Sequence, residues 1–166
     1  PYTEPVSRLL ELGDVSGEKT WRDYLALGLT EQDVPELTRM ILDEELHFAD
    51  SDSAEVWSAV HAWRALAQLG ATSAIPALIE LLSQVVEYGD DWISNDLPLV
   101  VAHLGQAALE PLRDFLADST QSQWSRVNAG NSLAKIGLRH PELRAESVAA
   151  LSRQLENFEQ QDRNFN

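Results

Sequence analysis

The chain has 166 residues, 27 Asp and Glu against 12 Lys and Arg, a formal net charge of −15 and no Cys. This composition excludes disulfides, thiolate metal sites and a Cys nucleophile, and it opposes a phosphate-binding surface, which needs clustered cations. No apolar run approaches the roughly 20 residues of a membrane span, and the first residues lack the pattern of a secretory signal. We therefore expect a cytoplasmic protein with no nucleic-acid partner and no membrane partner.

The sequence contains an internal repeat. Four short segments each place large apolar residues before a glycine, at Gly28, Gly70, Gly105 and Gly137. The intervals between these glycines are 42, 35 and 32 residues by subtraction. Helical repeats have periods of roughly 33 to 47 residues. Because glycine tolerates positive φ, each glycine should end a first helix, with a second helix following after a tight turn.

The first unit fits this pattern less well than the others. Its first helix should end at Gly28, but Trp21 aligns with Trp63 of the next unit instead of with the tryptophan that starts the later repeats. Its second helix is clearer, because apolar residues recur at helical spacing over residues 34–41 and Pro35 falls in the first turn.

In the second unit, small and apolar residues stand one, four, five, eight and twelve positions before Gly70, which is one stripe of an α-helix. The stripe consists of Leu69, Leu66, Ala65, Ala62 and Ser58. Residues 75–82 then repeat the apolar spacing of a second helix, with Pro76 in its first turn, where a missing N–H costs nothing.

Pro98 interrupts the first helix of the third unit. An internal proline loses a backbone hydrogen bond and clashes with the preceding turn. Either this helix kinks, or it begins at Pro98 after an N-cap at Asn95 or Asp96. The second helix of this unit repeats the apolar spacing up to Leu116, and Pro111 is expected in about its first turn.

The fourth unit has a regular first helix, from Trp124 to Gly137. In its second helix, residues 148–155, Gln154 replaces an apolar residue of the other units. Nothing obvious in the sequence covers the apolar face of this last pair, and the chain begins with Pro1 instead of Met. We therefore expect the native array to continue, or this end to pack on another molecule.

The segments His61–Leu82 and Trp124–Gly137 resemble HEAT repeats, in particular the bacterial HEAT-like repeats of the phycobilisome-lyase type. The resemblance implies an all-α fold, a right-handed α-α superhelix (HEAT-like solenoid) of about four antiparallel helix pairs. The resemblance further implies that residues 1–166 form a single domain, or a fragment of a longer array. Its units would be about 5–50, 54–88, 91–120 and 122–160. It also implies that Arg126, where the family often carries a cation, ties neighbouring units together.

The loop of residues 43–55 is the strongest candidate for a binding surface. It carries six acids and no Lys or Arg: Asp43, Glu44, Glu45, Asp50, Asp52 and Glu55. The equivalent loop one repeat later carries Glu87, Asp90, Asp91 and Asp96. Because equivalent loops of stacked repeats lie along one edge, the two groups could form one negative rim that attracts a basic segment. The alternative is a solvated edge that keeps the protein in solution.

Three tryptophans, Trp57, Trp92 and Trp124, share one position of the repeat. One interpretation is packing between repeats, with each indole N–H finding a partner. The other is an aromatic ladder beside the acids, which would hold Arg or Lys of a partner by cation–π contact. Trp57 and Trp92 belong to the candidate binding surface on this second interpretation.

Neither a metal site nor a catalytic site is expected. Asp50 and Asp52 resemble the start of a calcium loop, but Glu55 and His61 stand where an EF-hand needs Gly and Glu. A loose divalent site of Glu44, His47 and Asp50 stays open as an alternative. The four histidines, His47, His61, His103 and His140, scatter over different units, without a nucleophile–base pattern or a phosphate loop. Of these, His140 precedes a proline in a turn and should face solvent.

We therefore expect no enzyme and no cofactor, but a protein–protein interaction scaffold or adaptor. It would bind a protein partner with a basic segment through its acidic loop edge or its curved helical face. The resemblance implies an alternative, a bilin-lyase-like or chromophore-handling subunit, which the shortage of cations for bilin propionates opposes. A HEAT-like DNA glycosylase is discarded because it needs a basic groove.

Overall fold

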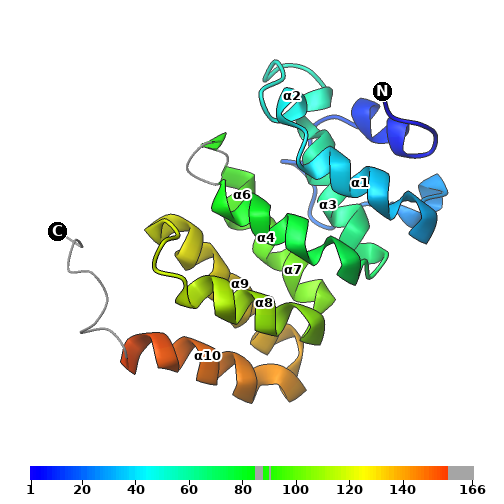
Figure 1. Ribbon diagram of the computed structural model, residues 1–166. Helices are drawn as coiled ribbons and strands as arrows, with labels where there is room; N and C mark the ends of the chain where they lie inside the picture. The colour runs from blue at the N-terminus through cyan, green and yellow to red at the C-terminus, as the bar shows by residue number, and fades with distance from the viewer. Residues whose placement is uncertain (85–87, 90, 157–166) are drawn as a thin grey trace. The chain divides into compact units, whose positions relative to one another are not determined.

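The computed structural model describes residues 1–84, 88–89 and 91–156, and these are all-helical (Figure 1). Over those ranges the chain forms nine α-helices, six 3₁₀-helices (η) and no strand. It falls into two compact units, Pro1–Leu81 and Leu82–Asn166. None of the helices in the described ranges has both the length and the apolar character that a bilayer crossing demands. The all-α prediction is confirmed, and the right-handed superhelix with its four unit boundaries stays a prediction.

The first unit consists of short helices around one buried helix, α3. Its elements are η1 (Val6–Glu11), η2 (Leu25–Leu27), η3 (Glu31–Asp33), α1 (Val34–Ile41), α2 (Glu44–His47), η4 (Glu55–Trp57), α3 (Ser58–Gln68), η5 (Thr72–Ala74) and α4 (Ile75–Ser83), which continues into the second unit. A capping box precedes α1, since Thr30 Oγ1 accepts from the Gln32 N–H and Asp33 accepts from the Thr30 N–H. Pro35 lies in the first turn of α1, as predicted.

The helix α3 is buried on all sides, since every residue from Ser58 to Ala67 is buried. A surface helix would keep one polar face in water. Here α1 packs on α3, and the N-terminal segment with η1 also contacts it. The predicted apolar stripe is therefore buried together with the face that carries His61 and Arg64.

The prediction of a full first helix that ends at Gly28 is wrong. Only Leu25–Leu27 forms a helical turn, and Gly28 closes it at φ 90° with its N–H bonded to the Leu25 carbonyl. The chain bends upstream, where Gly13 has φ +69° and the Asp14 carboxylate accepts two hydrogen bonds from Ser16. Downstream, the backbone bonds to α3 instead, since Gln68 accepts from the Tyr24 N–H and donates to the Arg22 carbonyl.

The second unit is built around α9. Its described elements are α6 (Asp91–Asn95), α7 (Leu97–Leu104), α8 (Gln106–Ala117), α9 (Gln123–Arg139), η6 (Pro141–Leu143) and α10 (Arg144–Glu156). The helix α9 packs against α7, α8 and α10, which places its apolar residues at the centre of this unit (Figure 1). Leu133 and Ile136 of α9 are fully buried there.

The two prolines of the second unit settle one alternative and correct one prediction. The helix α7 begins at Leu97 with Pro98 in its first turn, so the helix starts at the proline and does not kink. Asp96 is its N-cap residue, without a side-chain capping hydrogen bond. Pro111 was expected in about the first turn of its helix, but α8 begins as early as Gln106 and encloses it.

The glycine turns are confirmed at three of the four positions and wrong at the fourth. Gly28, Gly70 and Gly105 have positive φ and end their helices. Gly137 instead lies inside α9, which continues to Arg139. A Cβ on Gly137 would lie 3.1 Å from Ser147 Cβ, so this glycine permits the close approach of α10.

Candidate functional site

Asp43, the first residue of the acidic loop of residues 43–55, forms hydrogen bonds that stabilise the fold. Asp43 accepts from the Glu45 N–H at 3.1 Å and so caps α2. Its other oxygen accepts from the Tyr2 hydroxyl at 2.5 Å. Burial, together with the Asp43 carboxylate, raises the pKa of Tyr2 above its ordinary value. Asp43 therefore anchors the N-terminus and the start of α2, and it contributes less to the open surface than its neighbours.

The remaining five acids of the loop are exposed: Glu44, Glu45, Asp50, Asp52 and Glu55. Within the part of the chain that the structure describes, none of them forms an ion pair with Lys or Arg. Asp50 accepts from the Asp52 N–H at 3.0 Å, which fixes the turn after α2. Phe48, at the end of α2, is 62% exposed amid these carboxylates. The loop thus combines a concentrated negative charge with an apolar side chain in water.

The second acidic group is smaller in the structure than in the sequence. Asp91 is exposed at the start of α6, and Trp92 beside it is half-buried. Asp96 is buried at the start of α7, so it does not belong to an exposed rim. Asp90 and Glu87 lie outside the described residues. Because residues 43–55 and Asp91 belong to different units, a continuous rim across both stays a prediction.

The three repeat-related tryptophans do not share one environment. Trp57 is half-buried in η4, and Trp92 is half-buried in α6. Trp124 is 63% exposed in the first turn of α9. The exposure of Trp124 does not favour packing between repeats at that position, and an aromatic ladder across the units stays a prediction.

The alternative of a divalent site near His47 gains no support. His47 Nε2 donates to the Ile41 carbonyl at 2.8 Å, which ties the end of α2 back to α1. No group of three His, Cys, Asp or Glu side chains with metal-binding geometry occurs among the residues that the structure describes. This hydrogen bond of His47 holds the loop against α1.

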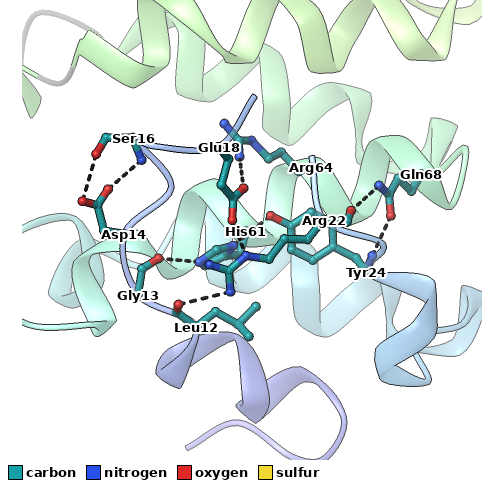
Figure 2. Close-up of polar contacts among 10 residues, drawn as sticks. All are labelled: Leu12, Gly13, Asp14, Ser16, Glu18, Arg22, Tyr24, His61, Arg64 and Gln68. Atoms are coloured by element: carbon teal, nitrogen blue, oxygen red, sulfur yellow. Dashed lines mark hydrogen bonds and ion pairs between the residues drawn. The ribbon is translucent and has the colours of Figure 1, made fainter. Parts of the chain in front are cut away.

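A buried polar network around His61 was not predicted from the sequence (Figure 2). The Tyr24 hydroxyl lies 2.8 Å from His61 Nδ1, and His61 Nε2 lies 2.8 Å from the Gly13 carbonyl oxygen. Because a carbonyl can only accept, Nε2 carries the proton, and Nδ1 accepts from Tyr24. Both side chains are fully buried. Burial lowers the pKa of His61 to about 4 and raises the pKa of Tyr24 to about 12, so both are neutral at pH 7.

Charged and amide groups surround this pair. Glu18 bridges two cations of different segments, since it pairs with Arg22 and lies 3.2 Å from Arg64 of α3. The Arg64 guanidinium also lies 5.6 Å from the centre of the Trp21 ring. Gln68 accepts from the Tyr24 N–H at 2.9 Å and donates to the Arg22 carbonyl at 2.7 Å (Figure 2). The network fastens residues 12–24 onto α3.

Position in the repeat gave no signal for this network. His61 and Arg64 lie beside the apolar stripe of α3, on a face that a repeat pattern predicts to be solvated. The partner residues Gly13, Glu18 and Tyr24 belong to the irregular segment that replaces the first helix. A cue does exist in the composition of α3, because seven of its eleven residues are Ala, Val, Leu or Trp, and few polar residues remain to face water.

In the second unit, Arg126 acts as the resemblance implied, and His140 does not lie where expected. Arg126 Nε donates to the Leu116 carbonyl at 2.9 Å, and Nη2 donates to Gln154 at 3.2 Å. It therefore ties α8 and α10 to α9. His140 was expected to face solvent, but its Nε2 donates to the Ala102 carbonyl at 2.9 Å.

Two hollows lie on the described surface of the second unit. One, of ≈ 430 Å³, lies among α8, α9 and α10 and has mainly apolar walls, with Val127, Gly130 and Leu151 among its lining residues. The other, of ≈ 260 Å³, lies between α7 and α9. We name the second one the basic groove; its lining residues are Leu99, Ala102, His103, Lys135, Leu138 and Arg139.

The comparison with family models gives one match. Residues 61–84, which run from α3 through α4, match the family described as PBS lyase HEAT-like repeat. No curated protein and no solved structure matches the chain. The predicted resemblance is confirmed over these residues, which are similar to that repeat.

Proposed function

We propose that this protein is a helical-repeat scaffold or adaptor that binds a partner protein through the acidic loop of residues 43–55. The partner would present a basic segment. One observation carries the proposal: Phe48 is 62% exposed in a loop whose exposed acids form no ion pair with Lys or Arg in the described part of the chain. A surface that only keeps a protein in solution needs the charges but not the exposed aromatic ring.

The acidic loop has both elements of a protein contact. Its carboxylates would steer a basic segment toward it and set the salt dependence of association. Phe48 would supply apolar contact area, or a ring face for Arg or Lys. The loop is also held in shape before a partner arrives, because Asp43 caps α2 and His47 ties α2 to α1. Little ordering entropy would then oppose binding.

The helical faces are weaker candidates for this contact. Glu36, Arg39, Arg113 and Asp114 stand on the second helices, and they pair within their own helix or with an adjacent residue. A face whose charges are already paired offers less to a basic partner than the unpaired loop. A cytoplasmic location, and a rim extended by Asp91 and Trp92, stay predictions within this proposal.

The test is capture of basic proteins from source-cell extract on immobilised protein, at low and high salt. The loop variant carries Glu44→Gln, Glu45→Gln, Asp50→Asn, Asp52→Asn and Glu55→Gln, and it keeps Asp43 as the cap of α2. The matched control neutralises five exposed glutamates elsewhere: Glu11, Glu31, Glu110, Glu142 and Glu146. We expect salt-sensitive capture by the native chain and by the control, and its loss in the loop variant. Equal capture by all three proteins would refute a role of the loop.

A second candidate function follows from the description of the matched family, which names a PBS lyase. A bilin would bind in the hollow of ≈ 430 Å³ among α8, α9 and α10, which is the larger of the two hollows named above and has mainly apolar walls. Its cation, Arg126, already bonds to the Leu116 carbonyl and to Gln154, which weakens it as a partner for a propionate. A shift of bilin absorbance on titration with the native protein would support this function, and an unchanged spectrum would remove it.

A further inference from the structure

The basic groove between α7 and α9 is an unusual surface on a chain with a net charge of −15. Lys135 and Arg139 stand one helical turn apart on α9, and Leu138 lies between them in sequence and is 69% exposed. Over the described residues, neither cation forms an ion pair. The groove therefore offers two available positive charges around an apolar centre.

His103 lies on the α7 side of the groove, near the Arg139 guanidinium. Its Nδ1 donates to the Leu99 carbonyl at 2.8 Å. Burial lowers its pKa, and the neighbouring Arg139 and His140 lower it further, against the opposing effect of the bond to Leu99. A carboxylate bound near Lys135 and Arg139 would relieve this repulsion. The chemistry of the groove thus fits an acidic segment that carries one apolar side chain.

The acidic loop of the same chain has the complementary pattern. Phe48 is exposed, and Glu44 stands one helical turn before it on α2 with Glu45 adjacent. Asp50 follows two residues later and is exposed. An apolar side chain flanked by carboxylates in the loop therefore matches an apolar hollow flanked by cations in the groove. No other partner has to be assumed to explain why both surfaces stay open to water.

We propose that the acidic loop of one copy docks into the basic groove of a second copy. Phe48 would contact Leu99 and Leu138, and Glu44 and Glu45 would pair with Lys135 and Arg139. The inference rests on the proposed function, since it identifies the basic partner of the loop as another molecule of the same protein. The contact joins different surfaces of the two copies, so the copy that contributes its loop keeps its groove, and the other copy keeps its loop.

The net charge of the chain opposes such association, but only at long range. Charges on two copies separated by more than about 8 Å are largely screened at 0.15 M salt, whereas the pairs across the contact are closer than that. Self-association should therefore appear near this ionic strength and weaken in about 1 M salt, where the close pairs are screened too.

The experiment is sedimentation velocity of the full chain over a concentration series at about 0.15 M salt. The loop variant carries Glu44→Gln, Glu45→Gln and Phe48→Ser, and the groove variant carries Lys135→Gln, Leu138→Ser and Arg139→Gln. We expect concentration-dependent association of the native chain. Each variant alone should associate at least about tenfold more weakly, since the contact loses its apolar centre and its charge pairs. A control with Arg113→Gln and Arg153→Gln changes charge elsewhere and should associate like the native chain.

A mixture of the two variants gives the decisive result. The groove variant keeps an intact loop, and the loop variant keeps an intact groove, so an equimolar mixture should form dimers although neither variant does so alone. A mixture that stays monomeric would overturn the inference, as would a native chain that stays monomeric throughout. Circular dichroism of both variants checks that loss of association is not loss of fold. If the native chain is monomeric while the loop still captures basic proteins from extract, the inference fails and the proposed function stands.

Discussion

His61 is the residue on which the first unit depends most. It joins Tyr24 and Gly13, which lie 37 and 48 residues away in sequence, in one buried contact. Its position in the repeat does not identify these partners, because they occupy an irregular segment far away in sequence. Buried polar groups are stabilising only while all of them are satisfied, so the network makes the position of residues 12–24 specific.

Replacement of His61 should therefore be costly. We expect His61→Leu to lower the free energy of unfolding by about 2 to 4 kcal/mol, because the Gly13 carbonyl and the Tyr24 hydroxyl lose their partners in a buried place. Tyr24→Phe should cost about 1 to 2 kcal/mol in the native background. It should cost distinctly less in the His61→Leu background, where its partner is already gone. Urea unfolding of the single and double variants measures the coupling, and additive losses would contradict the assigned hydrogen bond.

The same residue predicts a dependence of stability on pH. The folded pKa of His61 is about 4, below the ordinary value of 6.5. Between these values the unfolded chain binds a proton that the folded chain does not, so stability must rise with pH across this window. The contribution of His61 is fully present above pH 6.5 and is lost as the pH falls to 4, by about 3 kcal/mol in all.

Urea unfolding at several pH values between 7.5 and 4 measures this dependence, with His61→Gln as the comparison. The carboxylates titrate in both proteins, so the difference between them isolates His61. We expect the two stability curves to converge as the pH falls. Parallel curves would show that His61 does not remain neutral in the folded protein.

At the scale of elements, the sequence predicted helices whose signals are local and missed features that depend on distant segments. The apolar spacing and Gly70 located α3, and the start of α7 at Pro98 was one of two alternatives that the sequence left open. Gly137 follows the same spacing as the other glycines but does not end its helix. What distinguishes it is the approach of Ser147 on α10, a contact with no counterpart in the local pattern.

Two glycines of α9 provide a matched test of this interpretation. Gly137→Ala should destabilise the protein by about 1 to 3 kcal/mol, because its Cβ would lie 3.1 Å from Ser147 Cβ and 3.5 Å from the Arg144 Cα. In Gly130→Ala the new Cβ would lie no closer than 3.7 Å to the side chains of Leu151 and Leu116, which is ordinary van der Waals contact. The higher helix propensity of alanine should therefore stabilise the protein by about 0.5 to 1 kcal/mol. Thermal unfolding compares the two, and equal effects at both positions would rule out the close approach of α10 at Gly137.

The features of the candidate site also divide into those that the local sequence predicted and those that depend on distant segments. The charge of residues 43–55 was readable from composition, and the exposure of Glu44, Glu45, Asp50, Asp52 and Glu55 agrees with it. The hydrogen bond from Tyr2 to Asp43 was not readable, because it joins residues 41 positions apart. Nor was the basic groove, since Leu99 and Lys135 come from different repeats and become neighbours only when α7 packs on α9.

At the scale of the whole molecule, the chain combines two compact units with different internal supports. The first unit depends on the buried network around His61, whereas the second is organised by α9, with Arg126 fastening its neighbours. Repeat proteins can open one part while another stays folded. Acid should therefore open the first unit before the second.

Hydrogen exchange at pH 7.5 and pH 5, corrected for intrinsic rates, measures this order of opening. Loss of the His61 contribution between pH 6.5 and 5 amounts to about 2 kcal/mol, so protection of amides in α3 should fall about thirtyfold. Amides of α9 should lose less, because His103 also has a lowered pKa but is partly exposed. In His61→Gln the additional acid sensitivity of α3 should disappear. An equal loss in α3 and α9 of the native chain would mean that the two units unfold as one, and that the His61 network stabilises both of them.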